Sequence, residues 1–183
     1  MNFESAKDQL TKVLVTEEQI NSRVAELAAE IDKRYEGKDV LLVGVLKGAV
    51  MFMADLSRAL SISTSMDWMA LSSYGSGTVS SGVIRILKDL DAEIHGKDVL
   101  IVEDIIDSGL TLSWLETTLK ARGAASVEVV AFLRKPDAAK VEVPVWLVGF
   151  DIPNEFVVGY GLDYNEKYRS LNCVAVLDPK VYS

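Results

Sequence analysis

Short, largely apolar runs that can be buried on both faces are the feature that most constrains the fold of this 183-residue chain. Three of them cover Val40 to Val45, Asp98 to Val102 and Val127 to Leu133. Strands of antiparallel sheets with one wet face alternate between apolar and polar residues, whereas strands of covered parallel sheets read as continuous apolar runs. These runs therefore predict neighbouring strands of a mainly parallel sheet.

Segments with helical spacing separate these strands. Thr16 and Gln19 form a capping-box pattern before a helix that ends at Gly37. Further helices are expected from Ala49 to Leu60 and from Leu110 to Ala121. The remaining strands are expected at Met66–Ala70, Val83–Leu87, Val145–Val148 and Cys173–Leu177. This alternation predicts one α/β domain over residues 1–183, with ligands bound where the parallel strands end.

Charge and composition limit the classes of partner and compartment. The net charge of −8 disfavours nucleic acid as a partner, and a phosphorylated substrate would need positive elements placed in its site. No apolar run is long enough to cross a membrane, and the N-terminus lacks a signal-peptide pattern. The single cysteine, Cys173, excludes an intrachain disulfide and lies in an apolar run. We therefore expect a cytoplasmic protein.

The segment Val99 to Leu112 carries the strongest functional signal. It passes from a buried strand into a helix through Ser108, Gly109 and Thr111. A glycine allows the backbone to turn closely around an anion, and the first amides of the helix have no acceptor within the helix. This arrangement predicts a phosphate cradle without a lysine.

Three carboxylates precede this cradle, although carboxylates repel phosphates. Glu103, Asp104 and Asp107 suit a ligand that also carries hydroxyl groups, a metal ion or a proton to be removed. The alternative is an ordinary strand-to-helix loop with capping residues. The complete pattern of two acids, a spacer, a third acid and Ser-Gly-x-Thr favours a functional site.

These residues resemble the phosphoribosyl pyrophosphate loop of type I phosphoribosyltransferases. The segments LLVGVLKGA, SSYGSG, FLRKP and FVVGYGLDYNEKYRSL further resemble, in the same order, blocks of the hypoxanthine-guanine phosphoribosyltransferase family. The resemblance covers nearly the whole chain. It implies a type I phosphoribosyltransferase fold with a small hood region, and the joining of hypoxanthine or guanine to phosphoribosyl pyrophosphate in purine salvage.

The resemblance also assigns roles within the loop. It places Glu103 and Asp104 near the ribose hydroxyls, with the 5′-phosphate held by amides and hydroxyls from Asp107 to Thr111, including those of Ser108, Gly109 and Leu110. It makes Asp107 the general base that takes the N7 proton of the purine. A carboxylate is a reasonable choice because His95, the only histidine, lies in a turn before a strand.

Two lysines receive ligand-binding roles by the same resemblance. Lys47 and Gly48 follow the first buried strand; the family has a cis peptide there whose amide faces pyrophosphate. Judged from the residues alone, Lys47 could equally be a solvated loop lysine. Lys135 would donate to the purine 6-oxo group and would reject the amino group of adenine, since an ammonium group has no acceptor.

The C-terminal third contains the remaining expected site residues. By resemblance, Phe156 stacks on the purine and Val157 meets the edge of the base, although a lone Phe-Val pair is more typical of a core. Asp163 binds Mg²⁺ near the purine and pyrophosphate, with Glu103 and Asp104 as further candidate ligands. Arg169 holds the pyrophosphate. The alternative for the segment from Asp163 to Arg169 is a solvated polar turn.

The stretch from about 72 to 82 is rich in serine and glycine, which predicts a mobile loop. In the family this loop closes over the site, with Ser73 and Tyr74 contacting phosphoribosyl pyrophosphate. The resemblance further implies a homo-oligomer, either a dimer or a tetramer. Two other functions remain possible at this point: a transferase for xanthine or another base, and a non-catalytic regulator that binds phosphoribosyl pyrophosphate and nucleic acid.

Overall fold

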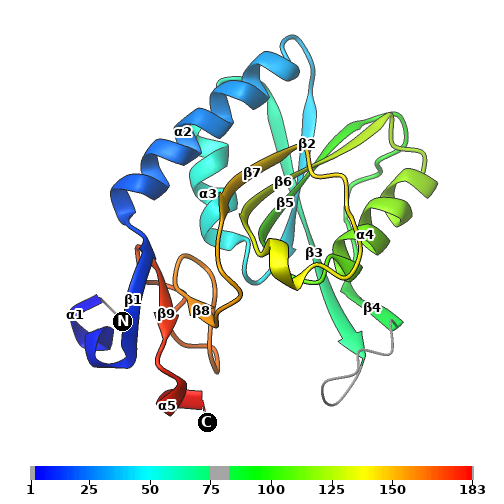
Figure 1. Ribbon diagram of the computed structural model, residues 1–183. Helices are drawn as coiled ribbons and strands as arrows, with labels where there is room; N and C mark the ends of the chain where they lie inside the picture. The colour runs from blue at the N-terminus through cyan, green and yellow to red at the C-terminus, as the bar shows by residue number, and fades with distance from the viewer. Residues whose placement is uncertain (1–2, 75–82, 183) are drawn as a thin grey trace.

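The computed structural model describes residues 3–74 and 83–182, and these form two sheets with helices around the larger one (Figure 1). The larger sheet has the strand order β4-β3-β2-β5-β6-β7. All its neighbouring strands are parallel except β3 and β4, which are antiparallel. The bounds are β2 Val40–Leu46, β3 Thr64–Tyr74, β4 Val83–Lys88, β5 Asp98–Ile106, β6 Ser126–Arg134 and β7 Leu147–Asp151.

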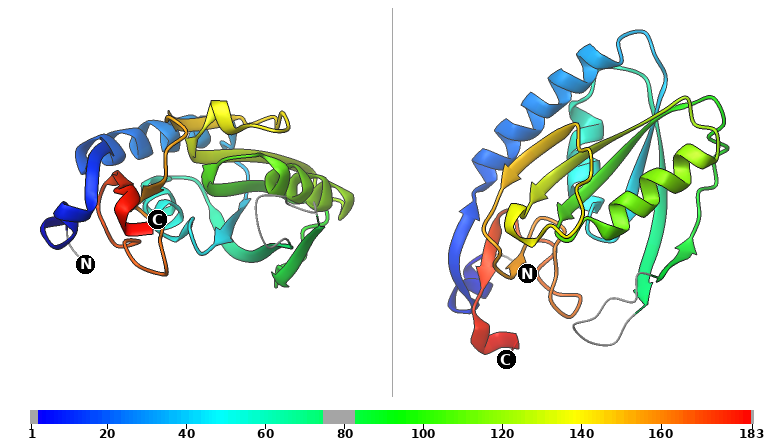
Figure 2. Two further views of the ribbon diagram at one scale, coloured as in Figure 1. Left: turned by 60° about the horizontal axis from the view of Figure 1, so that its bottom comes forward. Right: turned by 45° about the vertical axis from the view of Figure 1, so that its right-hand side comes forward.

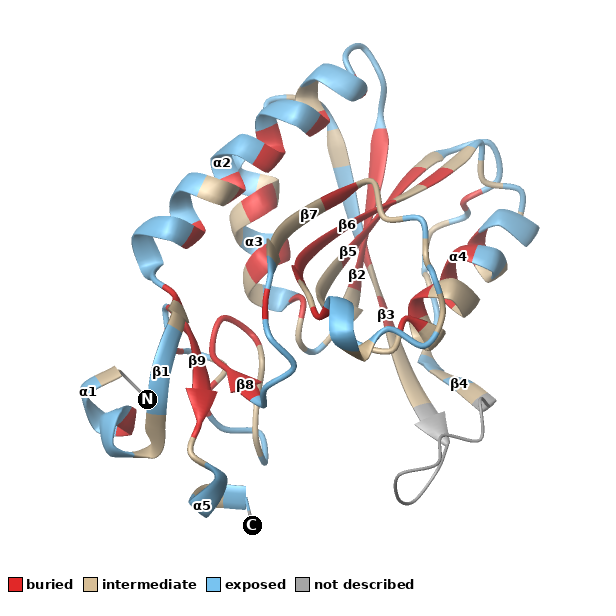
Figure 3. Ribbon diagram, viewed as in Figure 1, coloured by how far each residue is buried: buried red, intermediate tan, exposed pale blue. Residues whose placement is uncertain are grey.

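Helices cover both faces of this sheet, as Figure 2 shows from two further directions. Helices α2 (Glu17–Arg34) and α3 (Val50–Ala59) pack on one face, and α4 (Leu110–Ala121) packs on the other. Alternation within β2 shows why its apolar run is continuous. Leu42 packs with α2 and α3, whereas its neighbour Leu41 packs with α4. The buried strand positions appear as the red centre of Figure 3.

The start of α2 follows the expected capping box. The Thr16 hydroxyl accepts from the amide of Gln19 at 3.3 Å, and the Thr16 amide donates to the Gln19 side chain at 2.9 Å. Helices α3 and α4 lie within one residue of the expected bounds. Strand β7 begins at Leu147, two residues later than expected, and continues to Asp151.

A smaller antiparallel sheet with the order β1-β9-β8 forms the hood region. It joins β1 (Leu10–Val15), β9 (Val174–Leu177) and β8 (Val157–Val158), and so brings both ends of the chain together (Figure 1). Cys173 is buried beside it, and burial raises the pKa of its thiol, which disfavours the reactive thiolate form. The short elements are α1 Phe3–Ala6, η1 Lys7–Gln9, η2 Pro136–Ala138 and α5 Pro179–Tyr182.

Strand β3 continues through Tyr74 and pairs with β4 from Val83 onward. Its last three residues, which we expected in the loop, therefore belong to a strand. The rest of the expected mobile loop, residues 75–82, lies outside the described residues. Within the ranges described, no helix combines the length and the apolar character needed to cross a bilayer.

Candidate active site

The loops that follow β2, β5 and β6 meet the hood at one pocket of about 320 Å³. Parallel strands end at the same edge of their sheet, so residues far apart in the sequence converge there. The lining contains most of the residues that the sequence singled out: Lys47, Gly48, Asp104, Asp107, Lys135, Phe156, Val157, Asp163 and Arg169.

A second hollow of about 150 Å³ adjoins this pocket at the junction of β5 and α4. Glu103, Ser108 and Thr111 line it, together with Asp107 and Gly109. Gly109 caps α4 with a left-handed backbone, φ 79°, and turns the first amides of the helix toward the hollow. This geometry is that of an anion cradle. The Leu110 amide donates to the Ser108 hydroxyl at 3.5 Å, and Leu110 is not among the residues that line the hollow.

Glu103 and Asp104 adjoin each other in β5 but line different hollows, because successive strand residues face opposite sides of a sheet. Burial and the neighbouring Asp104 raise the pKa of Glu103 well above its ordinary value. Burial raises the pKa of Asp104 to about 6, against the effect of a bond from the Ile105 amide. Within the described residues, Glu103 Oε2 is buried without a hydrogen-bond partner. Both carboxylates are thus placed where a positive ligand or a hydroxyl group would stabilise them.

The turn after β2 packs directly on Asp104. The peptide between Leu46 and Lys47 is cis, as the family resemblance implied. Gly48 has no room for a side chain, because a β-carbon there would overlap the carboxylate of Asp104. The absence of a side chain therefore lets the Lys47–Gly48 backbone line the pocket beside Asp104.

Lys135 and Asp107 approach each other from β6 and β5. Lys135 Nζ lies 3.6 Å from Asp107 Oδ2. Only 8% of Lys135 is exposed, whereas the Asp107 side chain is 59% exposed. Ile106 accepts a bond from the Lys135 amide at 2.9 Å and fixes the two loops together. The arrangement places a hydrogen-bond donor and a proton acceptor side by side.

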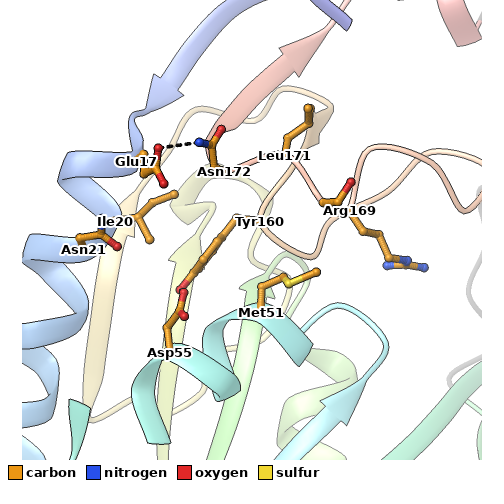
Figure 4. A pocket seen from close by; sticks show the side chains of 10 residues that line it. Glu17, Ile20, Asn21, Met51, Asp55, Tyr160, Arg169, Leu171 and Asn172 are labelled. Atoms are coloured by element: carbon orange, nitrogen blue, oxygen red, sulfur yellow. Dashed lines mark hydrogen bonds between the residues drawn. The ribbon is translucent and has the colours of Figure 1, made fainter. Parts of the chain in front are cut away.

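Arg169 is held by the hood loop. Its guanidinium contacts Asp163 Oδ1 at 2.9 Å and donates to the Gly161 carbonyl at 2.7 Å. A separate cavity of about 170 Å³, which contains the Tyr160–Asp55 hydrogen bond, lies behind it. In Figure 4 the guanidinium points away from that cavity. Arg169 therefore serves the pocket that it shares with Asp163.

The sequence pattern did not single out Glu166, which contacts both Lys47 and Arg169. The residue lies inside a segment that had been singled out, but sequence spacing does not reveal a contact with the distant Lys47. It also missed Tyr182, whose ring centroid lies 5.0 Å from that of Phe156. An aromatic residue close to the C-terminus was the only available signal.

Phe156 and Val157 differ in environment. Phe156 is 41% exposed and lines the pocket, so it is not a core residue. Val157 is buried in β8, packs against the larger core cluster and also lines the pocket. The backbones of Ser73 and Tyr74 lie in β3, and their side chains fall outside the described part of the structure.

Comparison with known proteins identifies the relatives of this chain. The model of the phosphoribosyl transferase domain matches residues 13–165. A hypoxanthine-guanine phosphoribosyltransferase of Mycobacterium tuberculosis is 57% identical over 179 residues, covering 94% of this chain and 89% of the relative. One of Bacillus subtilis is 50% identical, covering 96% and 98%. A crystal structure of a hypoxanthine phosphoribosyltransferase from Staphylococcus aureus has a TM-score of 0.95 and 46% identity, covering 98% and 97%.

The comparisons agree with the motifs, the mostly parallel sheet and the pocket at its carboxyl edge. The expected type I phosphoribosyltransferase fold is thus confirmed. The chain belongs to the hypoxanthine-guanine phosphoribosyltransferase family.

Proposed function

We propose that this protein transfers the 5-phosphoribosyl group of phosphoribosyl pyrophosphate to hypoxanthine or guanine, which yields a purine nucleotide and pyrophosphate. Family membership supports this function. The observation that carries the site assignment is the pair of Lys135 and Asp107, 3.6 Å apart between the anion cradle and the exposed ring of Phe156. The pair offers one donor and one proton acceptor to a base lying beside it.

Lys135 selects the base and Asp107 activates it. The buried ammonium group donates to the 6-oxo group, and a 6-amino group would leave it without an acceptor. Asp107 takes the proton from N7 as N9 forms a bond to C1 of the ribose. The bond between C1 and the pyrophosphate oxygen breaks, and the electron pair leaves with pyrophosphate. Phe156 offers a ring face to the purine, and Val157 offers its backbone to the edge of the base.

The cradle and two cations hold the phosphorylated substrate. The backbone from Asp107 to Thr111, including Leu110, would bind the 5′-phosphate at the start of α4. Lys47 and Arg169, together with the Gly48 amide, would bind pyrophosphate on the other side of Asp104. Ser73 and Tyr74 are proposed to contact the same ligand. These positive groups would attract an anionic substrate that the net charge of −8 otherwise repels.

The donor set fits Mg²⁺ bound together with its substrate. Within residues 3–74 and 83–182, no group of three or more metal-ligating side chains is present. Mg²⁺ is usually held by one or two carboxylates plus substrate phosphates. Asp163 and Asp104 share the pocket and interact electrostatically, and the orphaned Glu103 oxygen is a further candidate. The ion would neutralise charge on the departing pyrophosphate.

We further propose a cytoplasmic homo-oligomer, a dimer or a tetramer, built from single-domain chains. The family resemblance supports the assembly, and the single buried cysteine is compatible with a reducing compartment.

The test is turnover of phosphoribosyl pyrophosphate with five bases: hypoxanthine, guanine, xanthine, adenine and uracil. Each is measured with and without Mg²⁺. We expect product from hypoxanthine or guanine only when Mg²⁺ is present, and none from adenine or uracil. Faster turnover of xanthine than of hypoxanthine and guanine would identify xanthine as the substrate in their place. Binding of phosphoribosyl pyrophosphate without turnover of any base would indicate a regulator.

A further inference from the structure

One carboxylate oxygen in the hood loop contacts both cations that the proposed function assigns to pyrophosphate. Glu166 Oε2 lies 3.1 Å from Lys47 Nζ and 3.3 Å from Arg169 Nη2. Lys47 comes from the turn after β2, whereas Arg169 comes from the hood. A single oxygen therefore bridges the two sides of the pocket, as an oxygen of a bound anion would.

The backbone at Glu166 is unfavourable for this type of residue. Tyr164 and Lys167 exchange two backbone hydrogen bonds, at 3.3 and 3.0 Å, around a two-residue turn. Its central residues, Asn165 and Glu166, have φ values of 50° and 61°. Asparagine suits such a turn, but the second position normally holds glycine. A glutamate retained in a left-handed conformation points to a role for its side chain.

The surroundings hold this turn in place. Asp163 Oδ2 accepts a bond from the Glu166 amide at 2.9 Å, and Asp163 Oδ1 contacts Arg169. Gly161 packs so closely on the Gly48 carbonyl that a β-carbon there would collide with it. The hood loop and the Lys47 turn thus meet backbone to backbone. Glu166 lies within reach of both cations because of this close approach.

We propose that Glu166 is an internal substitute for pyrophosphate, which neutralises Lys47 and Arg169 in the free protein and gives way when pyrophosphate binds. This inference rests on the proposed function. The Glu166 side chain is 64% exposed, so it can rotate into solvent without losing buried contacts. Glu166 would keep the two cations in position between turnovers and would also weaken the binding of pyrophosphate, which favours release of this product.

The test compares inorganic pyrophosphate binding, with Mg²⁺, to the parent protein and to Glu166→Gln by titration calorimetry. The substitution removes the competing charge, and exposed ion pairs are each worth well under a tenfold change in most cases. We therefore expect binding about 2- to 10-fold tighter, with a difference that shrinks as salt rises. The KM for phosphoribosyl pyrophosphate should fall while that for hypoxanthine stays the same.

Two further variants separate charge from backbone. Glu26→Gln removes a similarly exposed glutamate, 58% exposed, from an ion pair with Arg23 on α2, and should not change pyrophosphate binding. Glu166→Gly removes the same charge as Glu166→Gln and also relieves the left-handed conformation. It should bind pyrophosphate more tightly than the parent and should also raise the Tm.

The outcomes are distinct. Unchanged or weaker pyrophosphate binding by Glu166→Gln would show that the carboxylate only orients the cations. Tighter binding by Glu166→Gly, without tighter binding by Glu166→Gln, would show the same. In either case the inference is wrong and the proposed function stands. If the parent protein binds no pyrophosphate, the assignment of Lys47 and Arg169 is wrong, and the inference is lost with it.

Discussion

The α-carbon of Gly48 lies against the carboxylate of Asp104, with no space for a methyl group between them. Gly48→Ala should therefore shift either the turn after β2 or Asp104. Overpacking of this kind costs about 1–3 kcal/mol, and we expect kcat/KM for phosphoribosyl pyrophosphate to fall by about 10- to 100-fold. Steady-state kinetics measure this effect.

Gly37→Ala is the control for this substitution. Gly37 has a left-handed backbone, φ 72°, and nothing lies within 4 Å of an added β-carbon. Gly37→Ala should lower the free energy of unfolding by about 1–2 kcal/mol and leave kcat/KM unchanged. Equal kinetic losses in both variants would mean that the effect at Gly48 is one of stability alone.

Asp107→Asn should lower kcat by about 10²- to 10⁴-fold, the range for the loss of a general base. Binding of phosphoribosyl pyrophosphate should change far less, because backbone amides supply most of the cradle. Asp137→Asn is a matched control, since Asp137 is exposed and lies in η2, outside the residues that line the pocket. A near-normal kcat for Asp107→Asn would remove the general base from the mechanism.

Lys135→Ala should lower kcat/KM for hypoxanthine while leaving the affinity for phosphoribosyl pyrophosphate largely intact. An unsatisfied acceptor costs about 1–3 kcal/mol, which corresponds to a loss of about 5- to 150-fold. The neighbouring Arg134 pairs with Asp151 at 2.7 Å and makes Arg134→Ala a suitable comparison. If both variants use hypoxanthine as the parent does, another group must read the 6-oxo position.

The acidic pair in β5 predicts how stability depends on pH. The folded-state pKa of Asp104, about 6, exceeds the ordinary value of 3.8, and that of Glu103 is also raised. The folded state therefore binds protons more tightly than the unfolded state. The contribution of Asp104 and Glu103 to the free energy of unfolding is fully present below about pH 4 and is lost as the pH rises through 6. Between about pH 4 and 6, the free protein should therefore lose stability as the pH rises.

Asp104→Asn tests this dependence through thermal unfolding at several pH values. The variant should be more stable than the parent at pH 7.5 by about 1–3 kcal/mol, and the difference should shrink toward pH 5. Mg²⁺ with pyrophosphate should stabilise the parent more than the variant. A constant difference at every pH would show that the carboxyl group does not titrate in this range.

The sequence predicted the parallel sheet and the edge at which the site forms, because local patterns encode both. Apolar runs such as Val40–Val45 mark buried strands, and Thr16 with Gln19 marks the start of a helix. Strand β1 was missed, since its burial depends on pairing with β9 at the other end of the chain. Local sequence carries no signal for such a partner.

The same limit applies within the site. The resemblance supplied roles for Lys135 and Asp107, but only the structure brings their side chains to 3.6 Å. The contact between Lys47 and Glu166 depends on two glycines, Gly48 and Gly161, that allow two backbones to approach. Packing of this kind is a property of the whole fold and not of any one segment.

The hood sheet sets the order in which the site can be completed during synthesis. Strand β9 is the central strand of that sheet, and β1 and β8 pair only with it. All strands of the larger sheet precede it, so a nascent chain can form the Asp107 cradle on the ribosome while β1 still lacks its partner. The surface that carries Phe156 is completed only when Val174 to Leu177 have emerged. The cradle for the 5′-phosphate can therefore form before the Phe156 carbonyl accepts its hydrogen bond from the Leu177 amide.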